Sequence, residues 1–444
     1  MLDTGDTAWM LISSALVLLM TPGLALFYGG MVRSKSVLNM MMMSLSSIGL
    51  ITILWVVYGY SMTFGDDVGA GLLGNPAEAF GLTGLTGEDA LSGTIPALVF
   101  VAFQATFAII TVALISGAVA DRMRFGPWLL FAGLWATAVY FPVAHWVFAF
   151  DGDGVTGGWI ANDLAAIDFA GGTAVHINAG AAALALAFVV GKRRGWPREP
   201  MRPHNLTLVM LGAGLLWFGW FGFNAGSALG AGYAAGFTFL NTIVATAAAM
   251  LSWLLVERIR DGRPTSLGAA SGIVAGLVAI TPACSSVSPM GAIAVGAVAG
   301  AVCALAVGLK YRLGVDDSLD VVGVHLVGGL VGTLLIGLLA TEASPAGVNG
   351  LFYGGGVDQL WRQAVGAFAV LFYSLVVTLV LAFAVRALVG LRVSDDEEVT
   401  GIDETEHAES GYDFSTLRGG GGLGTSRPQR PATSPVPATA GKES

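Results

Sequence analysis

Two histidines lie in matching contexts inside long apolar runs. His176 begins the string His-Ile-Asn-Ala-Gly and His325 begins His-Leu-Val-Gly-Gly, and a valine precedes each, so both fit Val-His-x-x-x-Gly. An aspartate lies upstream of each histidine, Asp168 by eight residues and Asp320 by five. Two facing imidazoles can share one proton, because a nitrogen of one ring donates while a nitrogen of the other accepts. Such a pair could relay a proton or accept one from a polar substrate.

A structural interpretation competes with this one. Each histidine could instead hydrogen-bond a backbone carbonyl and fix helix packing, although ionisable groups inside membrane spans are costly and are functional candidates by default. The repeated context favours the functional interpretation for His176 and His325. His145 lies in another apolar run without such a counterpart, so we expect it to serve packing.

Aromatic residues form a second set. Phe103 and Phe107 lie on one apolar run, and Trp220, Phe223 and the hydroxyl residue Ser227 lie on a later one. A cation can rest over aromatic faces, where each contact contributes about 0.5–2 kcal/mol. Aromatic residues also face lipid or gather at the membrane interface. Spacing alone favours that second interpretation.

The elements that carry these residues are long and apolar. A helix of about 20 apolar residues crosses about 30 Å of hydrocarbon, and lipid offers no partner for a free backbone amide. We therefore predict an all-α polytopic membrane protein with eleven transmembrane helices. The predicted spans are 8–31, 37–63, 94–119, 127–149, 171–190, 206–228, 237–256, 266–282, 290–309, 320–340 and 363–391.

The amino-acid composition excludes a soluble protein. Hydrophobic types make up 55% of the 444 residues and charged types only 11%, whereas soluble domains carry about 25% charged residues. The first apolar run lacks a basic front and is too long for a simple signal peptide, so we expect a mature span. The sequence contains no Gly-x-x-x-x-Gly-Lys-[Ser/Thr] motif, so we do not expect the chain to be an ATPase.

Basic residues alternate along the connections between the predicted spans. The second, fourth, sixth and eighth connections contain no lysine or arginine, and the tenth has one at the mouth of the last span. The odd-numbered connections and the residue after the last span are basic, with Arg33, Lys35, Arg122, Arg124, Lys192, Arg193, Arg194, Arg198, Arg202, Arg258, Arg260, Arg263, Lys310, Arg312 and Arg392. The positive-inside rule then predicts an N-terminus outside and a cytoplasmic C-terminus, which requires an odd number of spans.

The two histidine motifs occupy the fifth and tenth predicted spans. A repeat unit with an odd number of spans enters the membrane inverted in its second copy. We therefore predict two inverted five-helix halves, about 8–190 and 206–340, and one extra helix, about 363–391. The pseudo-two-fold axis would bring His176 and His325 together near the midplane. Residues 1–393 form the predicted membrane domain, 394–413 a polar cytosolic tail, and 414–444 a Gly-, Ser- and Pro-rich segment expected to be disordered.

Several strings together resemble the ammonium transporter family (Amt/Mep/Rh), on its Amt side. They are DFAGGTAVHINAG at 168–180, WFGFNAGS at 220–227, AITPAC at 279–284, DVVGVH at 320–325 and the tail string GIDETEHAESGY at 401–412. The resemblance covers about residues 8–413. It implies a bacterial ammonium transporter of the inner (plasma) membrane, a homotrimer with one path through each subunit, and neither enzyme activity nor a cofactor or metal.

The resemblance also implies a role for each matching residue. The implied groups are the twin pore histidines His176 and His325, the phenyl gate Phe107 and Phe223, the outer ammonium site Phe148, Ser227, Phe103 and Phe107, and the pore-organising residues Asp168, Trp220 and Thr281. One position departs from the family pattern. Phe148 stands where the family often has a tryptophan, so the π face offered to a cation is weaker and lacks an indole N–H.

The expected mechanism recruits NH4+ at an outer vestibule, deprotonates it and conducts NH3, with or without a relayed proton, through a hydrophobic pore. Two alternatives remain at this point. The chain could be an ammonium sensor or signalling protein, with the tail as its output and a trimeric PII-type protein as its cytosolic partner. It could also carry another solute by ion coupling, but such a site calls for carboxylates within the spans, and the spans hold almost none.

Overall fold

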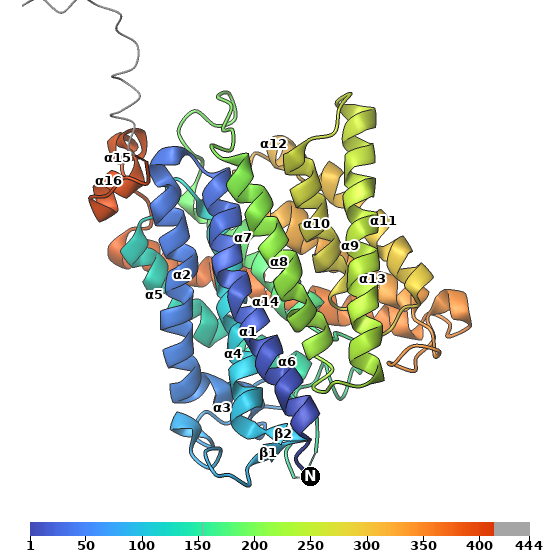
Figure 1. The fold of residues 1–444 in the computed structure, drawn as a ribbon. Coiled ribbons are helices and arrows are strands. Elements are labelled where there is room, and N and C mark those ends of the chain that lie inside the picture. The colour runs from blue at the N-terminus through green and yellow to red at the C-terminus, as the bar shows by residue number, and fades with distance from the viewer. Residues whose placement is uncertain (153, 413–444) are drawn as a thin grey trace, which may run out of the picture. The chain divides into compact units, whose positions relative to one another are not determined.

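The structure is a computed structural model and describes residues 1–152 and 154–412. These residues are mostly helical, with one two-stranded hairpin formed by β1 (Leu91–Ser92) and β2 (Ile95–Pro96). Figure 1 shows the helices side by side in one bundle. The segment predicted to be disordered, 414–444, lies outside the described residues.

The first half of the bundle contains five long helical segments, and two of them are made of shorter pieces joined by π-helical turns. The α-helices of this half are α1 (Thr4–Met31), α2 (Val37–Leu54), α3 (Tyr60–Phe64), α4 (Ala97–Ile115), α5 (Phe125–Trp135), α6 (Phe141–Phe148) and α7 (Asn178–Val190). Helix α7 continues a π-helical turn, η6 (Gly172–Ile177), which carries His176.

The second half resembles the first in its last helix. Its α-helices are α8 (Leu206–Gly226), α9 (Tyr233–Arg260), α10 (Ser266–Ile280), α11 (Pro289–Ala306), α12 (Leu309–Leu313) and α13 (Val327–Leu339), followed by the long α14 (Asp358–Val389). Helix α13 also continues a π-helical turn, η7 (Val322–Leu326), which carries His325. The two predicted histidine spans therefore begin in the same way.

Ten helical segments within the described residues are long and apolar enough to cross a membrane. The chain is thus a multi-pass helical membrane protein. The remaining predicted span, 266–282, coincides with α10, which is apolar but only 15 residues long. The count of eleven crossings stays a prediction.

Hydrogen bonds from the buried polar groups of aromatic side chains connect neighbouring helices in the bundle. The Trp135 indole donates to Thr378 Oγ1 at 2.9 Å, which ties α5 to α14. The Trp55 indole donates to the Val101 carbonyl at 3.1 Å, and the Tyr28 hydroxyl donates to the Leu114 carbonyl at 3.0 Å. A buried donor without a partner is expensive in an apolar interior, so these bonds fix which helices are neighbours.

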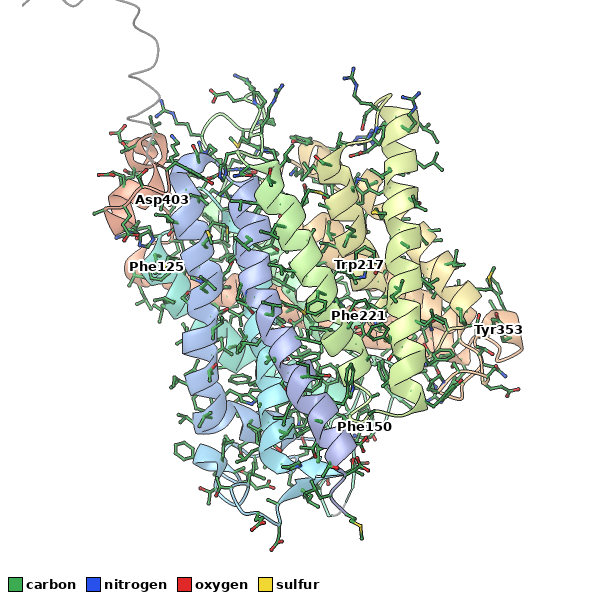
Figure 2. The ribbon with its side chains drawn as sticks, viewed as in Figure 1. Phe125, Phe150, Trp217, Phe221, Tyr353 and Asp403 are labelled. Atoms are coloured by element: carbon green, nitrogen blue, oxygen red, sulfur yellow. The ribbon has the colours of Figure 1, made fainter. Side chains whose placement is uncertain are left out.

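The last described helices lie at the opposite end of the bundle from the N-terminus (Figure 1). The tail forms α15 (Asp395–Thr400) and α16 (Ile402–His407). Figure 2 shows Asp403 of this tail close to Phe125 and far from Phe150.

Polar contacts hold the tail against the basic connections. Glu398 accepts from the Arg33 guanidinium at 3.2 Å, from Arg392 at 2.7 Å and from the Arg194 amide at 2.9 Å. Asp403 accepts from the amides of residues 38 and 39 at 3.0 and 2.8 Å, and burial there raises its pKa. The tail and the basic connections therefore share one end of the molecule.

Candidate functional site

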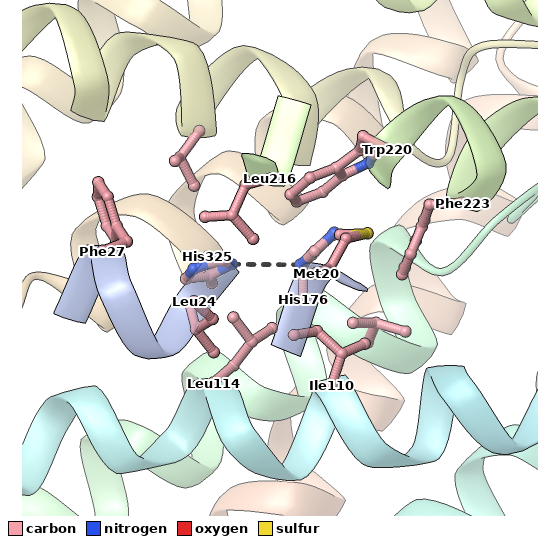
Figure 3. Close-up of a pocket in the computed structure, with 12 residues that line it drawn as sticks. Met20, Leu24, Phe27, Ile110, Leu114, His176, Leu216, Trp220, Phe223 and His325 are labelled. Carbon is pink, nitrogen blue, oxygen red and sulfur yellow. Dashed lines mark hydrogen bonds between the residues drawn. The ribbon is translucent and has the colours of Figure 1, made fainter. Parts of the chain in front are cut away.

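The two histidines meet in the interior of the bundle. Their Nδ1 atoms are 3.2 Å apart and their ring centroids 5.3 Å apart, with the planes inclined by 29° (Figure 3). Both side chains are almost fully buried. Because one Nδ1 must donate and the other accept, the two rings hold different tautomers when both are neutral. The pair can thus exchange roles by moving one proton.

The glycine of each motif explains how the two histidines come so close. A Cβ atom on Gly180 would lie 2.5 Å from the backbone nitrogen of Leu326, the residue after His325. A Cβ atom on Gly329 would lie 3.0 Å from Ile177, the residue after His176. The two turns therefore cross at their glycines in a reciprocal manner. This close approach is the physical reason for the spacing Val-His-x-x-x-Gly.

An aspartate anchors the start of each histidine turn. The carboxylate of Asp168 accepts four backbone N–H groups, those of residues 171–174, at 2.7 to 3.1 Å. Asp317 accepts the amides of residues 321 and 322 at 3.1 and 2.8 Å. These amides would otherwise lack partners at the helix start.

Asp317, not Asp320, is thus the structural counterpart of Asp168, and the sequence analysis did not select it. The signal was present, because Asp317 precedes His325 by eight residues, as Asp168 precedes His176. Asp320 instead accepts from the Lys310 ammonium at 2.6 Å. Burial, with Asp320 nearby, raises the pKa of Asp317 to about 6.

A narrow apolar cavity surrounds the histidine pair (Figure 3). Its volume is about 10 Å³, which is close to the minimum that holds one water-sized molecule. Besides the two histidines and Trp220, aliphatic, aromatic and thioether side chains line it, with Met20, Leu24, Phe27, Ile110, Leu114, Val175, Leu216, Phe223 and Val274. The described residues place no full charge on its wall. Such a wall suits a small neutral molecule.

Two stacked phenyl rings lie beside this cavity. Phe107 and Phe223 have ring centroids 4.2 Å apart and planes 29° apart, and both are buried. The Phe223 ring also stacks at 6.1 Å from His176. Ser227, one turn further along α8, lines a second and wider cavity. Phe223 thus lines the narrow cavity, and Ser227, four residues later, lines the wider one.

The wider cavity has a volume of about 460 Å³, and two of the four predicted outer residues line it, whereas Phe107 does not. Phe148, Ser227 and Asp168 line it, together with Phe150, which the sequence analysis did not single out. The Ser227 hydroxyl donates to the Phe223 carbonyl at 2.8 Å, so its oxygen keeps lone pairs for an incoming donor.

Phe103 does not line this vestibule. Its side chain is fully buried and its ring lies 4.9 Å from that of Phe107. The family resemblance implies a place for Phe103 in the outer ammonium site. One helical turn separates Phe103 and Phe107, and the Phe103 ring packs edge-on against the Phe107 ring. A direct contact of Phe103 with a cation in the vestibule finds no support in this geometry.

Trp220 and Thr281 fix the orientation of the His176 ring. The Trp220 ring lies 5.4 Å from the His176 ring with planes 22° apart, and its indole N–H donates to Thr281 Oγ1 at 2.8 Å. Thr281 Oγ1 lies 3.2 Å from Asn224 Oδ1 and 2.7 Å from the Leu277 carbonyl, both of which can accept its hydroxyl proton. Asn224 is a further member that the sequence analysis quoted in a motif without assigning it a role.

A third cavity continues on the tail side of the histidines. It is as narrow as the first, at about 10 Å³, and shares Phe27, Val274 and His325 with it. Asp320 and Ser271 add polar groups to its wall. The histidine cavity and this inner cavity therefore adjoin each other.

His145 lines none of these three cavities. Its Nδ1 lies 2.8 Å from the Thr63 carbonyl, and its Nε2 lies 3.3 Å from Asp67. These contacts connect α6 to the end of α3 and to the loop after it. Within the described residues, no cluster of three or more His, Cys, Asp or Glu side chains is arranged to hold a metal ion.

A multi-pass helical bundle with a wide mouth and a narrow apolar interior defines a membrane transport protein. Residues 8–412 match the Ammonium Transporter Family. An ammonium transporter of Mycobacterium tuberculosis is 69% identical over 439 residues, which cover 94% of this chain and 92% of that protein. The chain belongs to the ammonium transporter family, and ammonium is the substrate of its transport.

Solved structures agree with this assignment. The crystal structure of Saccharomyces cerevisiae Mep2 is 35% identical and superposes with a TM-score of 0.81, covering 89% of this chain and 88% of that one. A structure described as a sensor Amt protein is 29% identical and has a TM-score of 0.83, covering 91% and 98%. Both likenesses extend over most of the bundle.

Proposed function

We propose that the chain recruits NH4+ in the vestibule, deprotonates it at the phenyl pair and conducts NH3 past His176 and His325. The observation that carries this proposal is the 3.2 Å contact between two buried imidazoles inside a cavity just large enough for one small molecule. We assign residues 1–393 to the transport domain, with inverted halves at about 8–190 and 206–340. Residues 394–413 are the proposed regulatory tail.

Selectivity follows from the cost of burying charge. A bare ion in a narrow apolar passage loses its hydration and is disfavoured by several kcal/mol or more. Ammonium resembles potassium in size and charge, but it can leave its proton behind and continue as a neutral molecule. Potassium has no such option. The aliphatic wall around the histidines therefore discriminates by chemistry rather than by size.

The vestibule supplies what a cation needs before it loses its proton. The phenyl faces of Phe148 and Phe150 offer cation–π contacts, and the Ser227 oxygen accepts a hydrogen bond. The Asp168 carboxylate already accepts four backbone amides. Asp168 therefore acts by positioning the turn that carries His176, and its charge favours a cation nearby without direct contact.

The proton has a route through the histidine pair. One imidazole accepts a proton on the vestibule side while its partner releases one toward the inner cavity, where Asp320 lines the wall. If the pair relays the proton, transport carries net charge. If it only accepts hydrogen bonds from NH3, transport is electroneutral. Current measured on liposomes that contain the protein distinguishes these two modes.

The test compares the two histidine variants with the unmodified protein in liposomes on a solid-supported membrane. Ammonium and potassium jumps are applied, and the current and the internal pH are recorded. We expect His176→Ala and His325→Ala to lose the selective, proton-linked ammonium response while the variants still assemble. His145→Gln is the matched control, because this histidine is equally buried but lies outside the path. It should keep the ratio of ammonium to potassium response. Unchanged flux and selectivity in both alanine variants would refute the assigned role.

We further infer a homotrimer in the plasma membrane, with one path per subunit, an external N-terminus and a cytoplasmic C-terminus. The alternation of basic connections supports this orientation. The separation of the N-terminus from the tail across the bundle also supports it. Mass determination in detergent tests the trimer, and protease access to the tail in sealed vesicles tests the orientation.

A sensor role is the second candidate, since the tail contacts several basic connections and one structural neighbour is described as a sensor Amt protein. A PII-type signal protein that covers the cytosolic openings fits this surface. Purified protein in liposomes separates the candidates. An ammonium jump without any current or pH change would favour the sensor.

A further inference from the structure

One buried carboxamide on α14 contacts both histidine-bearing segments. Helix α14 lies outside the two proposed halves, and the Gln363 side chain near its start is fully buried. Its Oε1 accepts from the Ile167 amide at 2.6 Å, and its Nε2 donates to the carbonyl of the same residue at 2.7 Å. Nε2 also donates to the Thr333 carbonyl of α13 at 3.3 Å. Gln363 thus connects the segment before the His176 turn to the helix that continues the His325 turn.

The hydrogen-bonding capacity of this carboxamide is completely used. A glutamine side chain has two N–H donors and an oxygen with two lone pairs. Besides the three contacts to residues 167 and 333, the Gln363 Oε1 accepts from the Gln359 side-chain amide at 2.9 Å. A side chain of another length, or with another set of donors and acceptors, cannot make the same four bonds. Each lost bond leaves an unpaired polar group in an apolar interior, which is costly.

The residue that Gln363 holds directly precedes the anchor of the His176 turn. Ile167 is followed by Asp168, and both residues line the vestibule. Asp168 accepts the amides of residues 171–174 and so fixes the start of the turn that carries His176. Because the segment between them is short, a shift of the backbone at residue 167 also shifts the histidine.

A second contact from the same face of α14 holds the far end of this turn. The Ser374 hydroxyl donates to the Asn178 carbonyl at 2.8 Å, two residues after His176. Ser374 follows Gln363 by 11 residues, which is close to three helical turns of about 3.6 residues each, so both side chains lie on one face of α14. The same helix therefore holds the segment from 167 to 178 at both ends.

We propose that Gln363 is a positioning residue for transport, which sets the place of His176 relative to His325 by holding residue 167 against α13. This inference rests on the proposed function of the histidine pair. Gln363 lines neither the vestibule nor the two narrow cavities. It therefore acts through the Asp168 turn and not by contact with ammonium.

A purely structural role is the competing explanation for Gln363. The side chain would then only pair backbone groups that lipid and apolar side chains cannot satisfy. Its loss would lower the stability and the amount of folded protein. Each folded molecule would still transport ammonium as before.

Ammonium-induced current per folded protein, measured in liposomes on a solid-supported membrane, separates the two explanations. Gln363→Met keeps the length of the side chain and removes all four bonds. We expect this current to fall roughly tenfold, which corresponds to about 1.4 kcal/mol and is in the range for a buried group that loses its partner. The half-saturating ammonium concentration should stay nearly the same, because Phe148 and Ser227 lie on other helices.

Gln363→Glu gives a signature that a purely structural role does not. A neutral carboxyl group keeps a donor and an acceptor for residue 167, whereas a carboxylate has only acceptors and repels the carbonyl of that residue. Burial favours the neutral form of a carboxyl group. We expect the current, relative to that of the unmodified protein at the same pH, to be largely retained at about pH 5 and to fall at about pH 8.

Gln359→Met is the matched control. Gln359 lies one turn earlier on α14 and is also buried, and its amide donates to Gln363 rather than to the backbone of residue 167 or 333. This variant should keep its current per folded protein at both pH values. Unchanged current in Gln363→Met would overturn the proposal. A relative current of Gln363→Glu that does not vary with pH would overturn it too.

The two histidine variants, His176→Ala and His325→Ala, are measured alongside. If they lose ammonium transport while Gln363→Met keeps it, the inference about Gln363 fails and the proposed function stands. If they keep ammonium transport, the proposed function fails, and the inference about Gln363 fails with it.

Discussion

At the scale of single residues, the same side chain serves two purposes in this chain according to what surrounds it. Nδ1 of His145 faces a backbone carbonyl and its Nε2 faces a carboxylate, so neither nitrogen is open to a substrate. His176 and His325 face each other. The Nε2 atoms of His145 and His176 both lack a hydrogen-bond partner within the described part of the chain, but that of His145 has the Asp67 carboxylate 3.3 Å away, whereas no carboxylate of the described residues lies beside that of His176. The unpartnered nitrogen of His176 points to a transient partner, which we propose to be the transported molecule.

Phe148→Trp should strengthen the capture of ammonium. Phe148 lines the vestibule, and an indole presents a stronger π face than a phenyl ring. An additional 0.5–1 kcal/mol, the order expected for an exposed cation–π contact, corresponds to a half-saturating ammonium concentration about two- to fivefold lower. The measurement is the concentration dependence of the ammonium-induced current. Phe218→Trp, on the exposed face of α8, is the matched control and should change nothing. A half-saturating concentration that stays constant or rises in Phe148→Trp would contradict the argument.

At the scale of elements, the site depends on the crossing of the two histidine turns. Gly180 allows no added atom, because its Cβ would meet the Leu326 backbone at 2.5 Å. Gly329 is less tight, with the nearest atoms at 3.0 Å. The two glycines therefore occupy corresponding positions, but Gly180 tolerates an added Cβ atom less well than Gly329.

Gly180→Ala should consequently be more damaging than Gly329→Ala. Overpacking of this kind costs roughly 1–3 kcal/mol. Both glycines have backbone neighbours, but an added Cβ would lie 2.5 Å from backbone at Gly180 and 3.0 Å from the Gly172 carbonyl at Gly329, so Gly180→Ala forces the larger displacement. We expect Gly180→Ala to move the histidines apart and lose most ammonium-selective current, while Gly329→Ala keeps a substantial part. Thermal unfolding and current measured on the same samples separate lost stability from lost transport. Equal effects of both substitutions would show that the crossing is not asymmetric in the way the distances indicate.

Much of this arrangement could be predicted from the sequence, for physical reasons. Apolar length and the lack of backbone partners in lipid determine the helices, and the repeated Val-His-x-x-x-Gly pattern indicates a reciprocal contact. The counterpart of Asp168 in the second half was harder to predict. Asp320 lies closer to His325 in sequence than Asp317 does, so sequence distance alone favours Asp320. The hydrogen bonds from the amides of residues 321 and 322 identify Asp317 as the anchor. The direction in which Phe103 points depends on helix rotation, which a nearly uniform apolar run does not encode.

At the scale of the whole molecule, a chain of buried charges ties together connections that are far apart in sequence. Arg193 pairs with Asp316 at 2.8 Å and with Asp121 at 3.3 Å, and Asp121 also meets Arg33 at 3.4 Å. Arg33 in turn reaches Glu398 of the tail. The first, third, fifth and ninth connections and the tail therefore share one network, on the side where the inner cavity opens. Removal of one partner leaves a buried charge unpaired, which is strongly destabilising.

Asp316→Asn tests this network through its pH dependence. Burial alone would raise the pKa of Asp316, but the hydrogen bonds from Arg193 and the charge of Arg122 outweigh it and hold that pKa below the ordinary 3.8. A carboxyl group with a depressed pKa contributes stability that is fully present above its unfolded value and is lost as the pH falls through its folded value. At pH 7 we expect Asp316→Asn to be less stable by about 3–5 kcal/mol, the usual cost of breaking a buried pair. The difference from the unmodified protein should shrink below about pH 4.

Thermal unfolding in detergent between pH 7 and pH 3, followed by tryptophan fluorescence, measures this difference in stability. Asp261→Asn is the control, because that carboxylate pairs with Arg260 at the surface and should matter little at any pH. A stability difference between Asp316→Asn and the unmodified protein that stays constant across this range would show that Asp316 acts by shape and not by charge.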